Sequence, residues 1–182
     1  MPLSASQLDN LRIWFTERNF PLDKDLIFRI ANYQDLIHSW SGRINLVSKG
    51  DRSTIIENHI LDSLGPLELI PKQCLLIDIG TGAGFPGIPL ALFLPENRIT
   101  LVESVHKKIL FLRVVKDELE LENVEIIEGR FEELEFQTKF DIATLRALPR
   151  WESYISRIEK LVKPGGKIIY YKQRGIYTTI IV

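Results

Sequence analysis

A carboxylate stands at the entrance to a glycine-rich turn in this sequence. The stretch 75–89, LLIDIGTGAGFPGIP, runs from apolar residues into Asp78 and then passes through Gly80, Gly82, Gly84 and Gly87. The apolar run predicts a strand, the glycines predict a tight turn, and Pro86 predicts the first turn of a helix. A strand, a glycine turn and a helix in this order are typical of a site that binds a ligand through the backbone.

Charge distinguishes the two ligands that such a turn commonly holds. The segment GAGFPG matches the GxGxxG pattern of dinucleotide sites, but this match alone is a weak signal. A pyrophosphate favours backbone N–H groups with no anion close by. S-adenosylmethionine carries a sulfonium and an ammonium, which a carboxylate attracts. Asp78 therefore favours S-adenosylmethionine, and so do Pro86 and Pro89, because they remove amide donors from the first helical turn.

A second carboxylate, Glu103, follows the glycines by about twenty residues, where it could accept hydrogen bonds from both ribose hydroxyls. Because both cofactors carry a ribose, Glu103 does not discriminate between them. The alternative is that Asp78 and Glu103 only accept hydrogen bonds from loop amides. The residues that we expect to bind the cofactor on these grounds are Asp78, Gly80, Gly82 and Glu103.

The elements that must position these residues alternate in type after Pro71. LLIDI, ITLVE, VEIIE, FDIATL and KIIYYK are predicted strands, and IPLALFL, KKILFLRVVKDELE and WESYISRIEKLV are predicted helices between them. This alternation predicts a mostly parallel, Rossmann-like α/β sheet covered by helices. Ligands of such sheets bind at the carboxyl ends of the strands, where the glycine turn is expected to lie.

The first 70 residues have a different, helical pattern. Apolar residues at helical spacing predict helices over 7–19, 23–40 and 53–64, with Ser4 or Ser6 as the cap of the first. The chain has 182 residues and is 45% hydrophobic, which suits one globular domain. We therefore predict a single domain over 1–182, made of an N-terminal helical cap over 1–70 and a cofactor-binding core over 71–182.

Composition excludes several classes of protein. The net charge of -1 means that any contact with nucleic acid must come from a local basic patch. The single cysteine, Cys74, cannot form an internal disulfide, and no apolar run reaches the roughly 20 residues that span a bilayer. The amino terminus lacks the apolar stretch of a signal peptide. We expect a cytoplasmic monomer with no membrane partner.

His59 and Asp62 lie three residues apart on one predicted helical face and could serve a catalytic or metal site. Two ligands without a third make a poor metal site. The favoured interpretation is that these residues fasten the cap to the sheet, and we expect no metal site.

Several segments together resemble a known family. The glycine turn, with HILDSL before it and LVES, GRFEEL, FDIATLRA and LVKPGG after it, resembles the bacterial 16S ribosomal RNA guanine-N7 methyltransferases over residues 10–172. The resemblance implies a class I S-adenosylmethionine-dependent methyltransferase fold. It also implies methyl transfer to N7 of a guanine in the conserved 16S loop near the decoding site, with 16S ribosomal RNA or the small ribosomal subunit as the partner.

The resemblance also implies roles for individual residues. It places cofactor contacts on Gly80 and Phe85 of the turn, on Phe131 and Glu132 of GRFEEL, and on Arg146 of LRA. Phe131 could lie on the adenine ring while Glu132 meets its polar edge. Arg146 ends the fourth predicted strand near the expected position of the methyl group, which makes it the one catalytic candidate; otherwise catalysis is expected to be positioning.

Basic residues near the predicted ligand edge are candidates for RNA phosphate contacts. They are Arg43, Lys49, Arg52, Arg150, Lys172 and Arg174, and Arg146 could also take this role. Two alternatives to the RNA methyltransferase stay open: a methyltransferase that acts on a small molecule or a protein, and a non-catalytic RNA or nucleotide binder with the same fold.

The end of the sequence departs from the usual pattern of this fold. Members normally continue past the fifth strand with a helix and an antiparallel pair of strands, but ten residues follow Lys172 here. At most one further strand fits. We expect IYTTIIV to form a shortened edge strand or to reflect a truncated chain, and either leaves one sheet edge and part of the substrate wall undetermined.

Overall fold

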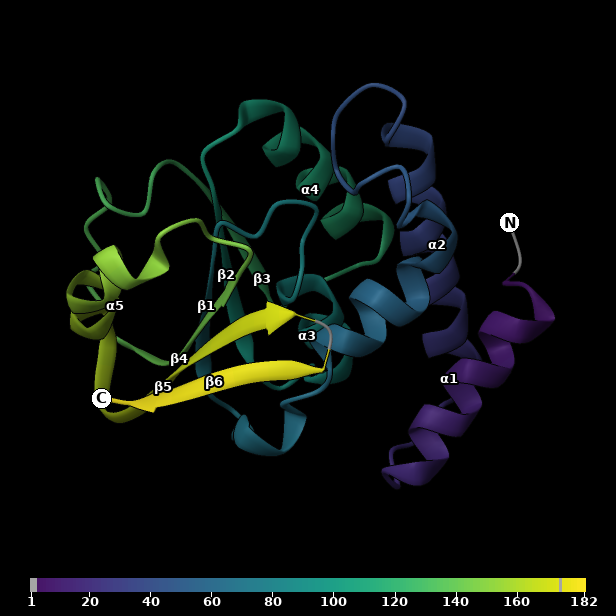
Figure 1. Ribbon diagram of the computed structural model, residues 1–182, viewed down its shortest axis with the longest axis horizontal. Coiled ribbons are helices and arrows are strands. Elements are labelled where there is room, and N and C mark those ends of the chain that lie inside the picture. The colour runs from purple at the N-terminus through teal and green to yellow at the C-terminus, as the bar shows by residue number, and fades with distance from the viewer. Residues whose placement is uncertain (1–2, 174) are drawn as a thin grey trace.

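The computed structural model describes residues 3–173 and 175–182, which form a twisted sheet flanked by helices (Figure 1). The six-stranded sheet has the order β3-β2-β1-β4-β5-β6. Its strands are β1 (Leu75–Ile79), β2 (Arg98–Glu103), β3 (Val124–Glu128), β4 (Phe140–Arg146), β5 (Val162–Gln173) and β6 (Ile176–Ile181). The first five strands run parallel, which confirms the predicted α/β sheet.

Helices cover both faces of the sheet, as the alternating pattern predicts. They are α1 (Ala5–Glu17), α2 (Lys24–Trp40), α3 (Gly87–Phe93), α4 (His106–Glu118) and α5 (Ile155–Leu161), with short 3₁₀ turns η1 (Arg52–Thr54), η3 (Leu67–Leu69) and η4 (Trp151–Tyr154). Figure 1 shows α1 and α2 on one side of the molecule and α5 on the other. Among the described residues, no helix combines the length and apolar character needed to cross a membrane.

The caps of the first two helices follow from their sequences. Ser4 Oγ accepts a hydrogen bond from the backbone N–H of Gln7, and Gln7 Oε1 accepts one from the backbone N–H of Ser4. This reciprocal pair is a capping box, so Ser4 and not Ser6 is the N-cap of α1. Asp23 caps α2 by accepting from the backbone N–H of Leu26 at 2.8 Å.

The helix predicted over 53–64 is present, but most of it does not have α-helical hydrogen bonding. The chain forms the 3₁₀ turn η1 and then a π-helix, η2 (Ile56–Leu61). In a π-helix the hydrogen bonds join residues five apart, so residues at that spacing share a face. Ile56 and Leu61 are both buried, as are Ile55 and Ile60. The wider turn therefore places two pairs of apolar side chains against the core.

The cap and the sheet share one hydrophobic core. On the face of the sheet that α1, α2 and α3 cover, buried side chains of the cap and the core form a single cluster. It includes Leu11, Phe15, Ile30, Ile37, Leu76, Ile88 and Leu101. A second cluster fills the opposite face beneath α5. Tyr33 of α2 is fully buried, and its hydroxyl donates to the backbone oxygen of Ala83 at 2.7 Å. The cap thus holds the glycine turn in place from one side.

A single strand follows β5, in agreement with the expectation that at most one more strand fits. β6 pairs antiparallel with β5, with Lys167 opposite Ile181 and Tyr171 opposite Tyr177. The backbone N–H of Val182 donates to Gly166 O at 3.0 Å, which extends the pairing to the last residue. β6 is therefore one edge of the sheet, and β3 is the other.

Candidate cofactor-binding cleft

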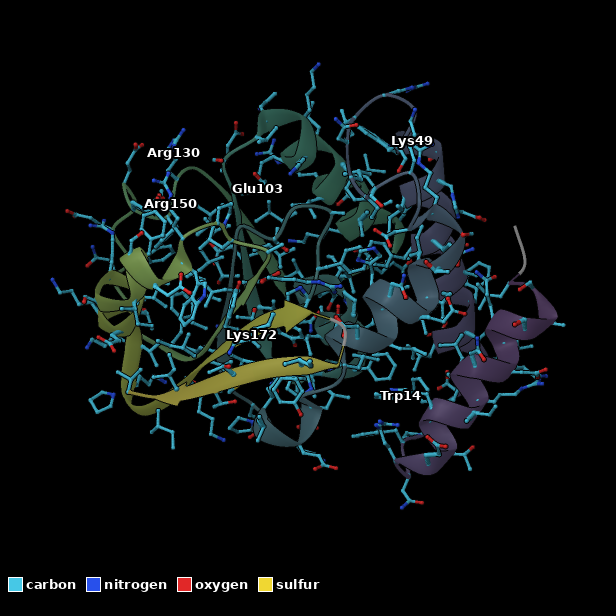
Figure 2. The ribbon with its side chains drawn as sticks, in the orientation of Figure 1. Trp14, Lys49, Glu103, Arg130, Arg150 and Lys172 are labelled. Atoms are coloured by element: carbon cyan, nitrogen blue, oxygen red, sulfur yellow. The ribbon has the colours of Figure 1, made fainter. Side chains whose placement is uncertain are left out.

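The carboxyl ends of four parallel strands meet at a cleft of about 280 Å³. Gly80 follows β1, Glu103 ends β2, Phe131 follows β3 and Leu148 follows β4, and all four line the cleft. The other lining residues are Val102, Ser104, Gly129, Arg130, Glu132, Pro149, Arg150 and Tyr154. Figure 2 shows Glu103, Arg130 and Arg150 close together at the upper left of the molecule. This is the edge at which a parallel sheet binds ligands.

The glycine turn brings backbone to the wall of this cleft. Gly80 and Gly82 have φ angles of 71° and 63°, a region that glycine adopts without the steric cost of a side chain. The backbone N–H groups of Gly80 and Thr81 both donate to Val102 O, at 2.9 and 3.1 Å. The turn is therefore fastened to β2, and Gly80 presents bare backbone to the cleft.

Gly87 begins α3 where the helix packs directly on the sheet. A Cβ atom at this position would overlap Leu101 Cδ2 and lie 2.9 Å from Asp78 Oδ2. We expect Gly87→Ala to lower the free energy of unfolding by about 1–3 kcal/mol, the usual cost of overpacking a core. Gly50→Ala is the matched control, because its Cβ would meet only Ser48 Oγ at 3.8 Å. Urea denaturation measures both, and equal midpoints would contradict this account.

Asp78 lies within β1 and is fully buried. Its Oδ2 accepts from Thr81 Oγ1 and from the backbone N–H of Gly87, and its Oδ1 accepts from Thr144 Oγ1 at 2.9 Å. Burial raises the pKa of this carboxyl group to about 6, although these hydrogen bonds act in the opposite direction. Direct contact between Asp78 and a cofactor, expected from the sequence, stays a prediction. Asp78 joins the two ends of the glycine turn, Thr81 and Gly87. This is the alternative role given above, in which the carboxylate accepts hydrogen bonds from the loop.

Glu103 accepts hydrogen bonds from loop amides, and its contact with a ribose stays a prediction. Its Oε2 accepts from the backbone N–H of Gly82 at 3.0 Å, and its Oε1 accepts from those of Ser104 and Val105 at 2.8 and 2.9 Å. A carboxylate offers about four lone-pair sites, so acceptor capacity remains after three such bonds. Since Glu103 also lines the cleft, a ribose hydroxyl could use that capacity.

Phe131 and Glu132 lie in the cleft wall after β3. The Phe131 ring packs edge to face against Tyr154, with centroids 5.3 Å apart. A rigid apolar ring beside a carboxylate suits the flat face and polar edge of an adenine. Sequence reasoning missed Leu148 and Tyr154, which complete this wall. The segment ALPRW was the available signal for Leu148, because every loop from a strand to the following helix reaches the ligand edge. Tyr154 lies inside the predicted helix, where no such signal exists.

The family model for the rRNA small subunit methyltransferase G proteins, GidB, matches residues 27–177. The chain belongs to this family. Ribosomal RNA small subunit methyltransferase G of Lachnoclostridium phytofermentans is 39% identical over 157 residues, which cover 83% of this chain and 65% of that protein. The Alkaliphilus metalliredigens protein of the same name is 33% identical over 162 residues, or 86% of this chain and 68% of that protein. The chain thus spans about two thirds of the length of these relatives.

Solved structures of other methyltransferases share the fold of this methyltransferase G family member. M. jannaschii TYW2 in complex with AdoMet superposes with a TM-score of 0.58 at 18% identity, covering 71% of this chain and 55% of that one. Precorrin-6y C5,15-methyltransferase from Geobacter metallireducens gives a TM-score of 0.53 at 19% identity, covering 69% and 64%. The predicted class I methyltransferase fold is confirmed.

Three residues expected to contact the cofactor in this family member lie elsewhere. Gly82 does not line the cleft; its amide is occupied by Glu103. Phe85 is buried against the cap, where its ring stacks on His59 with centroids 4.9 Å apart. Arg146 turns toward the π-helix, where its Nη2 lies 3.1 Å from Asp62 Oδ2 and 2.7 Å from Asn58 O. Phe85 therefore joins the glycine turn to the cap, and Arg146 joins β4 to the cap. Neither side chain lines the cleft.

The interpretation of His59 and Asp62 as a fastening between cap and sheet is confirmed. Asp62 pairs with Arg146 at the end of β4, and its Oδ1 accepts from the backbone N–H of Gly175 at 2.7 Å. The same carboxylate therefore joins the cap to β4 and to the β5–β6 connection. His59 is partly buried beside Arg146, and burial and this positive charge lower its pKa.

The basic residues proposed for RNA contact do not form one patch. Arg52 turns inward and donates from Nη2 to Ser41 O at 2.7 Å. Figure 2 shows Arg150 at the upper left, Lys49 at the upper right, and Lys172 lower on the sheet. Arg43 is exposed beside α4. Arg174 lies outside the described residues. The described members of the group therefore occupy three places. Arg150 lies at the cofactor cleft, Lys172 lies on β5, and Arg43, Lys49 and Arg52 lie in or near the loop after α2.

Proposed function

We propose that this chain binds S-adenosylmethionine in the cleft at the ends of β1–β4 and transfers the methyl group to N7 of a guanine in 16S ribosomal RNA. The observation that carries the proposal is a cleft lined by Gly80, Glu103 and Phe131 at the ligand edge, in a chain of the methyltransferase G family. The proposed partner is 16S ribosomal RNA or the small ribosomal subunit. A cytoplasmic monomer and a single domain with a cap over 1–70 stay predictions.

The residues of the cleft suit the parts of this cofactor. Glu103 would accept from the ribose, Phe131 would pack on the adenine, and Glu132 would lie near its polar edge. Gly80 would let the methionine part approach the backbone closely. Bound S-adenosylmethionine would supply a methyl group activated by its attachment to a sulfonium. The chain's own residues need only hold donor and acceptor in line.

Guanine N7 already carries a lone pair at neutral pH. No proton has to leave before the N–C bond forms, and the electrons of the broken C–S bond return to sulfur. The described lining of the cleft contains no histidine or cysteine, and the reaction requires neither. Positioning alone can supply several kcal/mol by removing translational and rotational freedom, roughly 7–11 kcal/mol in the best model reactions.

Transfer of label from radioactive S-adenosylmethionine tests the proposal. We expect the purified protein to label 16S ribosomal RNA or small subunits, with the product recovered as 7-methylguanosine. Glu103→Gln should weaken cofactor binding about tenfold, because it removes an ionised acceptor. Glu122→Gln is the matched control, since Glu122 is exposed and lies before β3 at the opposite edge.

Other outcomes of this assay select the alternatives. Label that enters only a small molecule or a protein would indicate a methyltransferase of another substrate class. Cofactor binding without transfer to any acceptor would indicate a non-catalytic binder. Either result would overturn the assignment of guanine N7.

A further inference from the structure

A second cleft, of about 380 Å³, lies beside the cofactor cleft. It is formed by the loop that follows α2 and by the start of α4, which lie side by side at the top of the view in Figure 1. Ser104 lines the cofactor cleft and the next residue, Val105, lines this one. A ligand in the second cleft would therefore be a close neighbour of a ligand in the first.

The charged residues of this second cleft are all basic. Arg43 comes from the loop, and Lys107 and Lys108 come from the first turn of α4. Within residues 3–173 and 175–182, Arg43 and Lys107 form no ion pair, and both are exposed. Lys108 Nζ lies 3.8 Å from Glu103 Oε2, so one of the three cations is partly offset. The cleft is thus strongly positive in a chain whose net charge is -1.

Ser41 provides an independent indication of a missing acceptor. It lines the cleft, is 5% exposed, and its Oγ has no hydrogen-bond partner in the part of the chain that the structure describes. A buried hydroxyl without a partner costs free energy, so native proteins rarely leave one unsatisfied. Its backbone oxygen accepts from Arg52, which places a fourth cation beside the cleft. An anionic oxygen in the cleft would offset the surrounding charge, and rotation of the Ser41 side chain about χ1 would let its hydroxyl donate to that oxygen.

We propose that this basic cleft binds a backbone phosphate of the RNA substrate, next to the nucleotide that enters the cofactor cleft. The inference rests on the proposed function, because RNA is the polyanion that a ribosomal RNA methyltransferase must hold. A guanidinium can bind two phosphate oxygens at once, while each lysine contributes a compact charge. Such contacts fix the position of the strand without reading its sequence. Arg43, Lys107 and Lys108 would therefore set the register in which guanine meets the methyl donor.

The double variant Arg43→Gln/Lys107→Gln tests this cleft, with Lys108 retained because it lies beside Glu103. The matched control is Arg98→Gln/Lys139→Gln, which removes one arginine and one lysine at the opposite edge, where β2 and β4 begin. The measurement is the Kd for transcribed 16S ribosomal RNA over a range of KCl concentrations. We expect the cleft variant to raise Kd roughly tenfold and to reduce the slope of log Kd against log salt by about one to two.

The expected behaviour of the controls separates this proposal from the function on which it rests. Affinity for S-adenosylhomocysteine and the melting temperature should stay at wild-type values in both double variants. A slope that is unchanged, or reduced equally in the control, would overturn the phosphate cleft even if the wild-type protein methylates RNA. If the wild-type protein binds RNA through the cleft but transfers no methyl group, the proposed function fails and the cleft stands. If the wild-type protein binds no RNA, both fail.

Discussion

Replacing Arg146 with alanine should lower the free energy of unfolding by about 3–5 kcal/mol, the usual cost of removing one partner of a buried ion pair. Arg146 Nη2 lies 3.1 Å from Asp62 Oδ2, and the Asp62 side chain is only 4% exposed. The guanidinium also donates to the backbone oxygens of Asn58 and His59. Alanine would leave the carboxylate and both carbonyls short of donors in a site that water reaches poorly.

Lys163→Ala is the matched control for this variant. Lys163 Nζ lies 2.8 Å from Asp141 Oδ1, but the two side chains are 43% and 31% exposed. Solvent screens such a pair, so its loss should cost less than about 1 kcal/mol. Equilibrium unfolding in urea, followed by circular dichroism, compares the two variants. Similar losses in both would contradict the view that Arg146 holds the cap on the sheet.

The positions of β1 to β4 could be predicted because their apolar runs are bounded by residues that interrupt a strand, whereas β5 begins at Val162, five residues before the predicted run KIIYYK. LLIDI, for example, corresponds to β1 over Leu75–Ile79 without a shift. The π-helix could not be predicted in this way. The apolar residues over 53–64 fit an α-helical period, and no local signal favours bonds between residues five apart. The requirement to bury Ile55 with Ile60 and Ile56 with Leu61 arises only when the cap packs on the sheet.

The sequence predicts which residues lie at the ligand edge better than it predicts which atoms their side chains contact. Gly80 and Glu103 were placed correctly at the ligand edge because residues that leave a parallel strand must lie there. Asp78 differs because it lies inside β1, paired with Leu101 on one side and Thr144 on the other. A side chain within a central strand points to a face that helices cover, not to the edge. That distinction was available in the sequence and explains why Asp78 is buried and bonded to the glycine turn, while its contact with a cofactor stays a prediction.

The second cleft could not be foreseen, although Arg43 was among the candidates. Lys107 and Lys108 occur at the start of a predicted helix, where basic residues usually indicate only a solvated surface. They form a cleft only together with the loop after α2, which lies about 65 residues earlier in the chain. No short sequence motif spans that distance.

Asp78→Ala should disrupt the glycine turn and weaken cofactor binding at least tenfold, with a loss of about 3 kcal/mol or more in unfolding free energy. It would leave Thr81 Oγ1 and the buried Gly87 N–H without their acceptor, and Thr144 Oγ1 with only the longer contact to Ile77 O at 3.4 Å. Asp78→Asn is the informative companion. The amide oxygen can accept from Thr81 and Gly87 while the amide nitrogen donates to Thr144 Oγ1. Near wild-type binding of S-adenosylhomocysteine by Asp78→Asn would assign the role to geometry, and a loss as large as in Asp78→Ala would assign it to charge.

A comparison of the wild-type protein with Asp78→Asn also reveals whether Asp78 is protonated in the folded state. Burial raises the pKa of the folded carboxyl group to about 6 from its ordinary 3.8, so the folded state binds the proton more tightly than the unfolded state. The stabilisation from this proton is complete below about pH 4 and is lost as pH rises through 6. Asparagine is neutral throughout. The stability of the wild-type protein relative to Asp78→Asn should therefore fall by roughly 2–3 kcal/mol between pH 4 and pH 7. Urea denaturation across this range measures the difference, and parallel pH profiles would show that Asp78 is already ionised in the folded protein at pH 4.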